Sequence, residues 1–287
     1  MIVRFDLIAL AVLAPAAVLA WRLVRPELWA RALTLLGLLG VVTLALVLGR
    51  WGVFALAIAI GLGAAMELAR AGGLRPPLAL LAAAIGFALP LLGTVATNLA
   101  LAAFVLAVAA MALVRRPVLV RPWFAFVLAG ALLGVALGFL VRLDSLGAGA
   151  IILLVLVLQF NDGVGYAVGG RFGRTRPFPA LSPGKSVEGY LAGGVGALIA
   201  VLLLATVDPV LRASAWPDLV AVGAVLVVTA NAGDLLLSRL KRSAGLKDFG
   251  RLLPGHGGVL DRFDGWLVST PVLFVLVSIL PVLVARR

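Results

Sequence analysis

Residues 147–170 read GAGAIILLVLVLQFNDGVGYAVGG, a run in which Asp162 is the single charged side chain. A helix needs about 20 mostly apolar residues to cross a bilayer, and this run is long enough. An aspartate at bilayer depth costs about 2.5–3.5 kcal/mol even on the mildest insertion scale, so such residues usually face a cavity. The stretch therefore predicts a membrane-spanning helix with a polar site toward one end.

The rest of the chain has the same apolar character. Of its 287 residues, 63% are hydrophobic and 13% are charged, with a mean hydropathy of +1.20, whereas soluble domains carry about 25% charged residues. We expect an all-α, polytopic integral membrane protein with about 9–10 transmembrane helices and a polar cavity that faces the cytosol. The candidate spans are 4–24, 32–49, 52–69, 78–93, 99–114, 123–141, 147–170, 189–207, 218–237 and 265–284.

The basic residues are distributed unevenly between the two ends of these spans. With the N-terminus outside, 18 of the 24 lysines and arginines fall in predicted cytoplasmic loops, among them 171–188 and 238–264. Because basic loops stay in the cytoplasm, we expect this end to face the cytosol from the cell membrane. The net charge of +12 then indicates orientation and contacts with phosphates or anionic membrane lipids, and no nucleic-acid partner is expected.

Most of the chemistry-bearing residues lie in the second half. Residues 1–120 are expected to form a scaffold of transmembrane helices, and 121–287 a catalytic region with polar loops at 159–190 and 231–265. The chain has no cysteine and one histidine, His256. Thiolate sites and cages of several histidines are thereby excluded, and a metal would be held by oxygen ligands that suit Mg²⁺-like hard cations.

A second aspartate, Asp234, also lies inside an apolar span, and each aspartate has an asparagine nearby, Asn161 and Asn231. We expect both aspartates to line a pocket that is open to the cytosol. The alternative is a structural role, in which each pairs with an amide or backbone group to hold helices together. Glu67, near the end of its span, is interpreted more simply as a partner of Arg70 at i, i+3.

The loop after Asp234 combines carboxylates with positive charge. Ser238 and Lys241 share a helix face with Asp234, while Asp261 and Asp264 are three residues apart. Three carboxylates that converge suit one or two hard cations. Between them, the Pro-Gly-His-Gly-Gly turn at 254–258 lets phosphate approach backbone N–H groups. The nearby basic residues are Lys241, Arg242, Lys247 and Arg262.

This combination is what phosphoryl or nucleotidyl transfer needs, because that chemistry depends on neutralising charge and positioning phosphates. A basic loop that binds lipid head groups is the alternative, but it explains neither the turn nor the aspartates. In the other loop, Ser182-Pro-Gly-Lys185-Ser186 lacks the spacing of a Walker A motif. Lys185 nevertheless precedes a predicted helix start, where a phosphate can bind.

Taken together, these residues resemble the signature of the phosphatidate cytidylyltransferases, also called CDP-diacylglycerol synthases. The matching run is Ser238-x2-Lys241-Arg242-x4-Lys247-Asp248-x-Gly250-x2-Leu253-Pro254-Gly255-His256-Gly257-Gly258-x2-Asp261-Arg262-Phe263-Asp264. Asn161-Asp162 and the loop from Ser182 to Gly189 also resemble segments of that family. The resemblance covers about residues 120–285 and is carried by fixed spacings.

The resemblance implies that CTP and phosphatidic acid give CDP-diacylglycerol and pyrophosphate. It implies Mg²⁺, with a second cation left open, and points to a homodimer. Asp234, Asp261 and Asp264 would be the metal ligands and, with Lys241, the catalytic residues. The residues implied to bind substrate and phosphate are Asn161, Asp162, Ser182, Lys185, Ser238, Arg242, Lys247, Asp248, His256, Gly257, Gly258 and Arg262.

One departure keeps other substrates open. After Asn161-Asp162 the family usually has a threonine, whereas this chain has Gly163. A cytidylyltransferase or CTP-dependent kinase acting on another lipid phosphate or lipid alcohol therefore stays an alternative. A more remote one is an ion-coupled transporter that uses Asp162 and Asp234, but it predicts inverted repeats, which we do not find.

Overall fold

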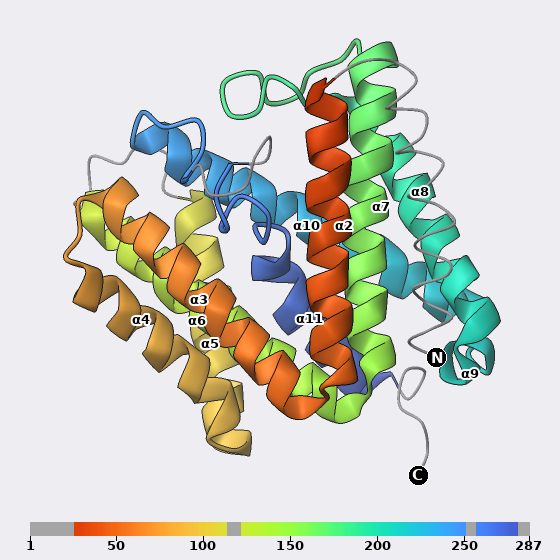
Figure 1. Ribbon diagram of the computed structural model, residues 1–287, viewed down its shortest axis with the longest axis horizontal. Helices are drawn as coiled ribbons and strands as arrows, with labels where there is room; N and C mark the ends of the chain where they lie inside the picture. The colour runs from red at the N-terminus through yellow and green to blue at the C-terminus, as the bar shows by residue number, and fades with distance from the viewer. Residues whose placement is uncertain (1–25, 114–121, 251–256, 281–287) are drawn as a thin grey trace.

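The computed structural model describes residues 26–113, 122–250 and 257–280. Within these ranges the chain is a bundle of helices without an extended strand, and nine of the ten expected spans coincide with helices (Figure 1). The remaining span, 4–24, lies outside the described residues. The helices are α2 (Pro26–Val47), α3 (Arg50–Gly72), α4 (Pro76–Ala88), the 3-10 turn η1 (Leu89–Leu91), α5 (Thr94–Leu113), α6 (Pro122–Leu146), α7 (Ala148–Phe172), α8 (Val187–Val207), α9 (Pro209–Arg212), α10 (Trp216–Ser243) and α11 (Trp266–Ile279).

Six of the described helices are long and apolar enough to cross a membrane, namely α3, α5, α6, α7, α8 and α10. Large apolar side chains cover their outer faces, such as Leu106 on α5 and Leu191 on α8, which are 71% and 68% exposed. Exposed apolar surface on this scale is stable in lipid and not in water. The prediction of an all-α polytopic membrane protein is therefore confirmed.

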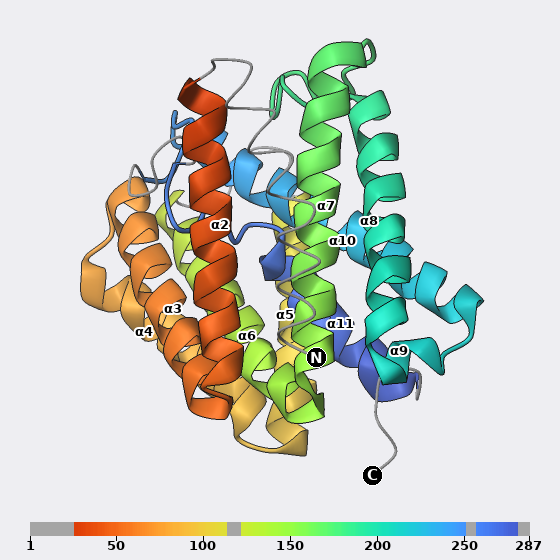
Figure 2. The same cartoon turned by 45° about the vertical axis from the view of Figure 1, so that its right-hand side comes forward.

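Successive helices run in opposite directions, so the connections alternate between two ends of the bundle. The loop 173–186 and the segment after α10 lie at one end, while α9 and the α2–α3 turn lie at the other (Figures 1 and 2). The two polar loops therefore share one end, as the sequence predicts. The short helix α9 was not expected, and it is capped by the buried Asp208, whose carboxylate accepts the N–H groups of Val210 and Leu211.

Two groups of closely packed helices form the bundle. Helix α7 packs along α8, and α3 and α4 pack along α6. Since α6 also contacts α11 and α7, helices from both halves of the chain share one core. The division at residue 120 stays a prediction.

Close approach of α7 and α8 depends on glycine. A Cβ atom on Gly193 of α8 would lie 2.5 Å from the backbone oxygen of Asn161 on α7, which real side chains do not tolerate. Small residues let membrane helices approach in this way. The glycine thus sets the separation of the helix pair next to Asp162.

Helix α11 is short because the chain before it reaches into the bundle. The segment 257–265 descends from the polar end and α11 begins inside, at the buried Trp266 (Figure 1). Asp261 and Asp264 are carried inward by this segment, to the depth at which α7 and α10 present their own polar residues.

Candidate active site

Three carboxyl groups gather where α7, α10 and the segment before α11 meet. Asp162 comes from α7, Asp234 from α10, and Asp264 from the segment before α11. The carboxyl groups of Asp234 and Asp264 contact each other, and Asp162 acts on both electrostatically. Carboxyl groups that lie this close together favour a positive charge beside them.

Lys185 supplies that positive charge from the other polar loop. Its amine forms an ion pair with Asp234. Burial alone would lower the pKa of Lys185, but the charges of Asp234 and Asp162 raise it above the ordinary value. The lysine is therefore held as a cation beside the carboxylates.

The loop that carries Lys185 is fixed by local hydrogen bonds at the start of α8. The hydroxyl of Ser186 accepts the N–H of Gly189 at 3.1 Å, which is a helix N-cap. The carboxylate of Glu188 accepts the N–H groups of Arg174 and Thr175. Lys185 is thereby presented from a defined turn.

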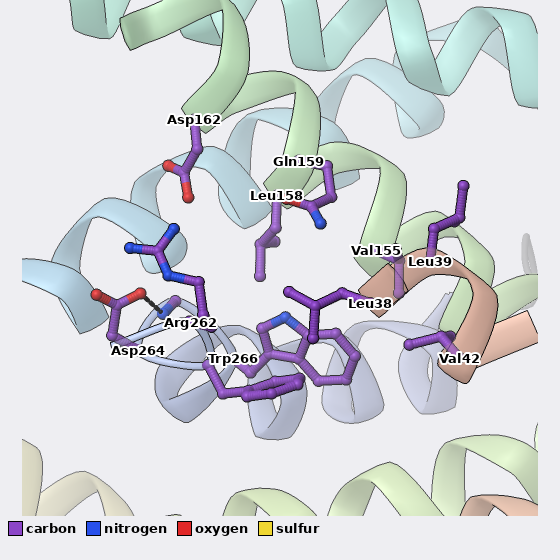
Figure 3. A pocket seen from close by; sticks show the side chains of 12 residues that line it. Leu38, Leu39, Val42, Val155, Leu158, Gln159, Asp162, Arg262, Asp264 and Trp266 are labelled. Carbon is purple, nitrogen blue, oxygen red and sulfur yellow. Dashed lines mark hydrogen bonds between the residues drawn. The ribbon is translucent and has the colours of Figure 1, made fainter. Parts of the chain in front are cut away.

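A pocket with two chemically different sides opens next to the carboxylates (Figure 3). Its polar side carries Asp162, Arg262 and Asp264, together with Gln159. Its apolar side is formed by α2, α7 and Trp266, and the apolar side chains are Leu38, Leu39, Val42, Val155 and Leu158. The pocket thus places charged side chains next to an apolar wall.

Asp261 takes a different position from the one expected. Its Oδ1 accepts a hydrogen bond from Lys241 Nζ at 2.9 Å, and its Oδ2 accepts the N–H groups of Phe249 and Gly258, both at 2.9 Å. Both partners of this ion pair are buried. As the side chains stand, Asp261 pairs with Lys241 and does not join Asp234 and Asp264, and the predicted roles of Asp261 and Lys241 in metal binding and catalysis stay predictions.

The donor set fits Mg²⁺ in its chemistry. Oxygen ligands without sulfur or imidazole suit a hard cation, and Mg²⁺ is often held by one or two carboxylates with water and substrate phosphate. Asp234 and Asp264 already contact each other and are balanced by the ammonium of Lys185. As the side chains stand, no three histidines, aspartates or glutamates of the described residues are grouped so that they could hold a metal ion.

Comparison with known proteins identifies the family. The model of the cytidylyltransferase family matches residues 29–280. This chain belongs to the cytidylyltransferase family. The resemblance found in the signature residues is thereby confirmed, and the match extends it into the N-terminal helices.

Three individual proteins that are similar to this chain illustrate the relationship. A protein named phosphatidate cytidylyltransferase from Mycobacterium leprae is 42% identical over 139 residues, which cover 47% of this chain and 42% of the relative. One of the same name from Bacillus subtilis is 35% identical over 182 residues, 60% of this chain and 66% of the relative. An uncharacterized protein from Escherichia coli, YnbB, is 36% identical over 128 residues, 45% of this chain and 42% of the relative. The matched part thus spans less than half of two of these three relatives and 66% of the third.

The other predicted residues of this cytidylyltransferase-family site fall into three groups. Asn161 is buried and donates to Asp162 at 3.2 Å, while its amide also meets that of Asn231. Ser238 is buried and donates to Asp234 at 3.3 Å. These groups orient the carboxylates, and the bond from Asn161 to Asp162 is the kind of contact that the structural alternative for the aspartates describes.

The second group lies at the surface of the polar end. Arg242 donates to the backbone oxygens of Leu181 and Leu246 and so ties the two polar loops together. Lys247 and Asp248 are exposed, and Ser182 is half-buried in the turn before Lys185. Their predicted contacts with phosphate stay predictions.

The third group is the glycine turn. Gly257 has a φ of 80°, which side chains other than glycine rarely adopt, and the N–H of Gly258 donates to Asp261. His256 lies outside the described residues, and its role in binding phosphate stays a prediction.

Sequence reasoning missed two contributions. Glu67 accepts hydrogen bonds from the backbone of Val259 and Leu260 instead of pairing with Arg70. A charged residue near the end of an apolar span was the signal in the sequence that Glu67 contacts polar groups within the bundle. Gln159 is a polar residue within an apolar run and lines the pocket, whereas nothing in the sequence of α2 singled out Leu38 or Leu39.

Proposed function

We propose that this chain is a CTP:phosphatidate cytidylyltransferase that makes CDP-diacylglycerol and pyrophosphate. The observation that carries the proposal is the two-sided pocket, where Arg262 and the carboxylates adjoin an apolar wall, in a chain of the cytidylyltransferase family. Relatives named phosphatidate cytidylyltransferase support the choice of lipid. An ion-coupled transporter explains neither the pocket nor the match.

In the proposed reaction, an oxygen of the lipid phosphate attacks the α-phosphorus of CTP. The new P–O bond forms as the bond to the β-phosphate oxygen breaks, and pyrophosphate leaves with that electron pair. A phosphate monoester is already anionic near neutral pH, so the attack needs no dedicated base. Binding, orientation and charge neutralisation are then the main contributions of the protein.

The residues divide these tasks. Arg262 offers a planar guanidinium that binds phosphate oxygens in pairs, and Lys185 adds a second cation at the start of α8. We assign the lipid chains to the apolar side formed by α2 and α7, and Mg²⁺ to Asp234 and Asp264, which would hold it together with water and substrate phosphate. Bound Mg²⁺ would neutralise developing negative charge on the phosphates.

The polar end is proposed to face the cytosol, where CTP is found, and the protein to span the cell membrane several times. The positive-inside distribution of arginine and lysine supports this orientation. A second metal cation beside Mg²⁺ and a homodimer stay predictions.

A product assay tests the proposal. Purified protein in detergent is given phosphatidic acid, CTP labelled in the α-phosphate, and Mg²⁺. We expect label in CDP-diacylglycerol with equal release of pyrophosphate. If labelled lipid instead forms only with a polyprenyl phosphate or a lipid alcohol, the substrate assignment is wrong, and the alternative of another lipid substrate is supported.

A further inference from the structure

The carboxylate of Glu67 joins the first half of the chain to the signature loop. Glu67 lies near the end of α3 and is 5% exposed. Its Oε1 accepts the N–H of Val259 and its Oε2 accepts the N–H of Leu260, both at 2.9 Å. These two residues directly precede Asp261 and Arg262. Each oxygen of one side chain thus holds one of two consecutive N–H groups in the turn that carries the site.

Two glycines of the loop make room for this carboxylate. A Cβ atom on Gly250 would lie 2.3 Å from Oε1 of Glu67, and one on Gly258 would lie 2.4 Å from both oxygens. The N–H of Gly258 meanwhile donates to Asp261. The turn is therefore held from one side by Glu67 and from the other by Asp261.

The burial of Glu67 needs an explanation beyond helix packing. A buried carboxylate is costly unless it is paired with a cation or well hydrogen-bonded, and the ion pairs of the described residues do not include it. Its charge is instead compensated by the backbone donors of the turn. An apolar side chain would fill the same space on α3, but it could not orient those N–H groups.

We propose that Glu67 is a positioning residue for the nucleotidyl transfer. By fixing the turn at 257–264, it sets where Arg262 and Asp264 stand relative to Asp162 and Asp234. This inference rests on the function proposed above. Since a displacement of about 1 Å can cost about a hundredfold in rate, loosening the turn lowers turnover even when the protein stays folded.

The test compares Glu67 with a matched carboxylate at the opposite end of the bundle. Asp208 is also buried and also accepts two consecutive backbone N–H groups, at the start of α9. Glu67→Ala and Asp208→Ala therefore remove the same kind of interaction. We expect similar losses of thermal stability in detergent, but only Glu67→Ala should lower kcat, by about 10- to 100-fold per folded molecule.

The conservative variant Glu67→Gln keeps the proposal testable if Glu67→Ala fails to fold. Its amide keeps one acceptor oxygen, so it should restore part of kcat relative to Glu67→Ala. The KM for CTP should change less than kcat, because the turn is displaced and not removed. Unchanged kcat in both Glu67 variants, or an equal fall in Asp208→Ala, would overturn the proposal.

Amide hydrogen exchange separates this inference from the proposed function. In the full-length protein, Glu67→Gln should speed exchange at Val259 and Leu260, while Asp208→Ala should leave these amides unchanged. If the wild-type protein makes no CDP-diacylglycerol, the substrate assignment fails, and exchange still decides whether Glu67 holds the turn. Unchanged exchange in Glu67→Gln would contradict that role.

Discussion

At the scale of single residues, the two aspartates of the Asp261-Arg262-Phe263-Asp264 run do different work. Asp261 has both oxygens occupied by Lys241 and by backbone N–H groups, while Asp264 contacts Asp234 beside the pocket. One therefore stabilises the turn, and the other is proposed to belong to the reacting site. Two substitutions distinguish these roles.

Asp261→Asn should destabilise the fold. It removes one partner of a buried ion pair and leaves the charge of Lys241 buried without compensation, which typically costs about 3–5 kcal/mol. Thermal unfolding in detergent measures this loss, and Asp248→Asn, at an exposed carboxylate in the same loop, should unfold like the wild type. If Asp261→Asn keeps wild-type stability but needs a higher Mg²⁺ concentration for half-maximal rate, Asp261 is a metal ligand as the family resemblance implies.

Asp264→Asn should keep the fold and lose activity. Its carboxylate makes no ion pair among the described contacts, so its neutral isostere should not leave a buried charge unpaired. We expect turnover to fall by about a hundredfold or more, as for other groups that stabilise transition-state charge, with a higher Mg²⁺ concentration for half-maximal rate. A Mg²⁺ titration of CDP-diacylglycerol formation checks this, and an unchanged titration would remove Asp264 from the site.

At the scale of elements, the α7–α8 pair offers two adjacent glycines with different surroundings. Gly193 faces the backbone of Asn161, whereas a Cβ atom on Gly194 would meet only a side-chain carbon of Val227, at 3.8 Å. We expect Gly193→Ala to destabilise the protein by about 1–3 kcal/mol through overpacking and to displace Asp162. Gly194→Ala should be neutral or slightly stabilising, because alanine favours helix. Thermal unfolding and turnover of the two variants provide the comparison, and equal effects would contradict it.

The elements themselves were largely predictable, and their contacts were not. Apolar runs of spanning length gave nine spans that match described helices, because lipid imposes that length on each run independently. Aspartates inside such runs marked Asp162 and Asp234 as candidate site residues, because a charge at bilayer depth is costly. By contrast, the bonds from Glu67 join residues about 190 positions apart, and no local periodicity encodes them. Asp261 lies in a turn, where helical spacing does not apply, so its pairing with Lys241 could not be read from the i, i+3 pattern.

At the scale of the whole molecule, the two ends of the bundle should face different compartments. The chain has no cysteine, so single cysteines report their own location. Lys247 is exposed at the polar end, and Ala215 is exposed between α9 and α10 at the other end. In sealed right-side-out vesicles, a membrane-impermeant maleimide should label Ala215→Cys directly and Lys247→Cys only after permeabilisation. The reverse pattern would overturn the proposed orientation.

The ion pair between Lys185 and Asp234 also affects how the protein can be handled. In many metalloproteins, removal of the ion leaves carboxylates that repel one another, and a chelator then unfolds the protein. Here a tethered ammonium from the chain's own loop lies against the carboxylates and offsets that repulsion. Purification and storage in EDTA should therefore leave the bundle intact, and activity should return as soon as divalent ion is restored.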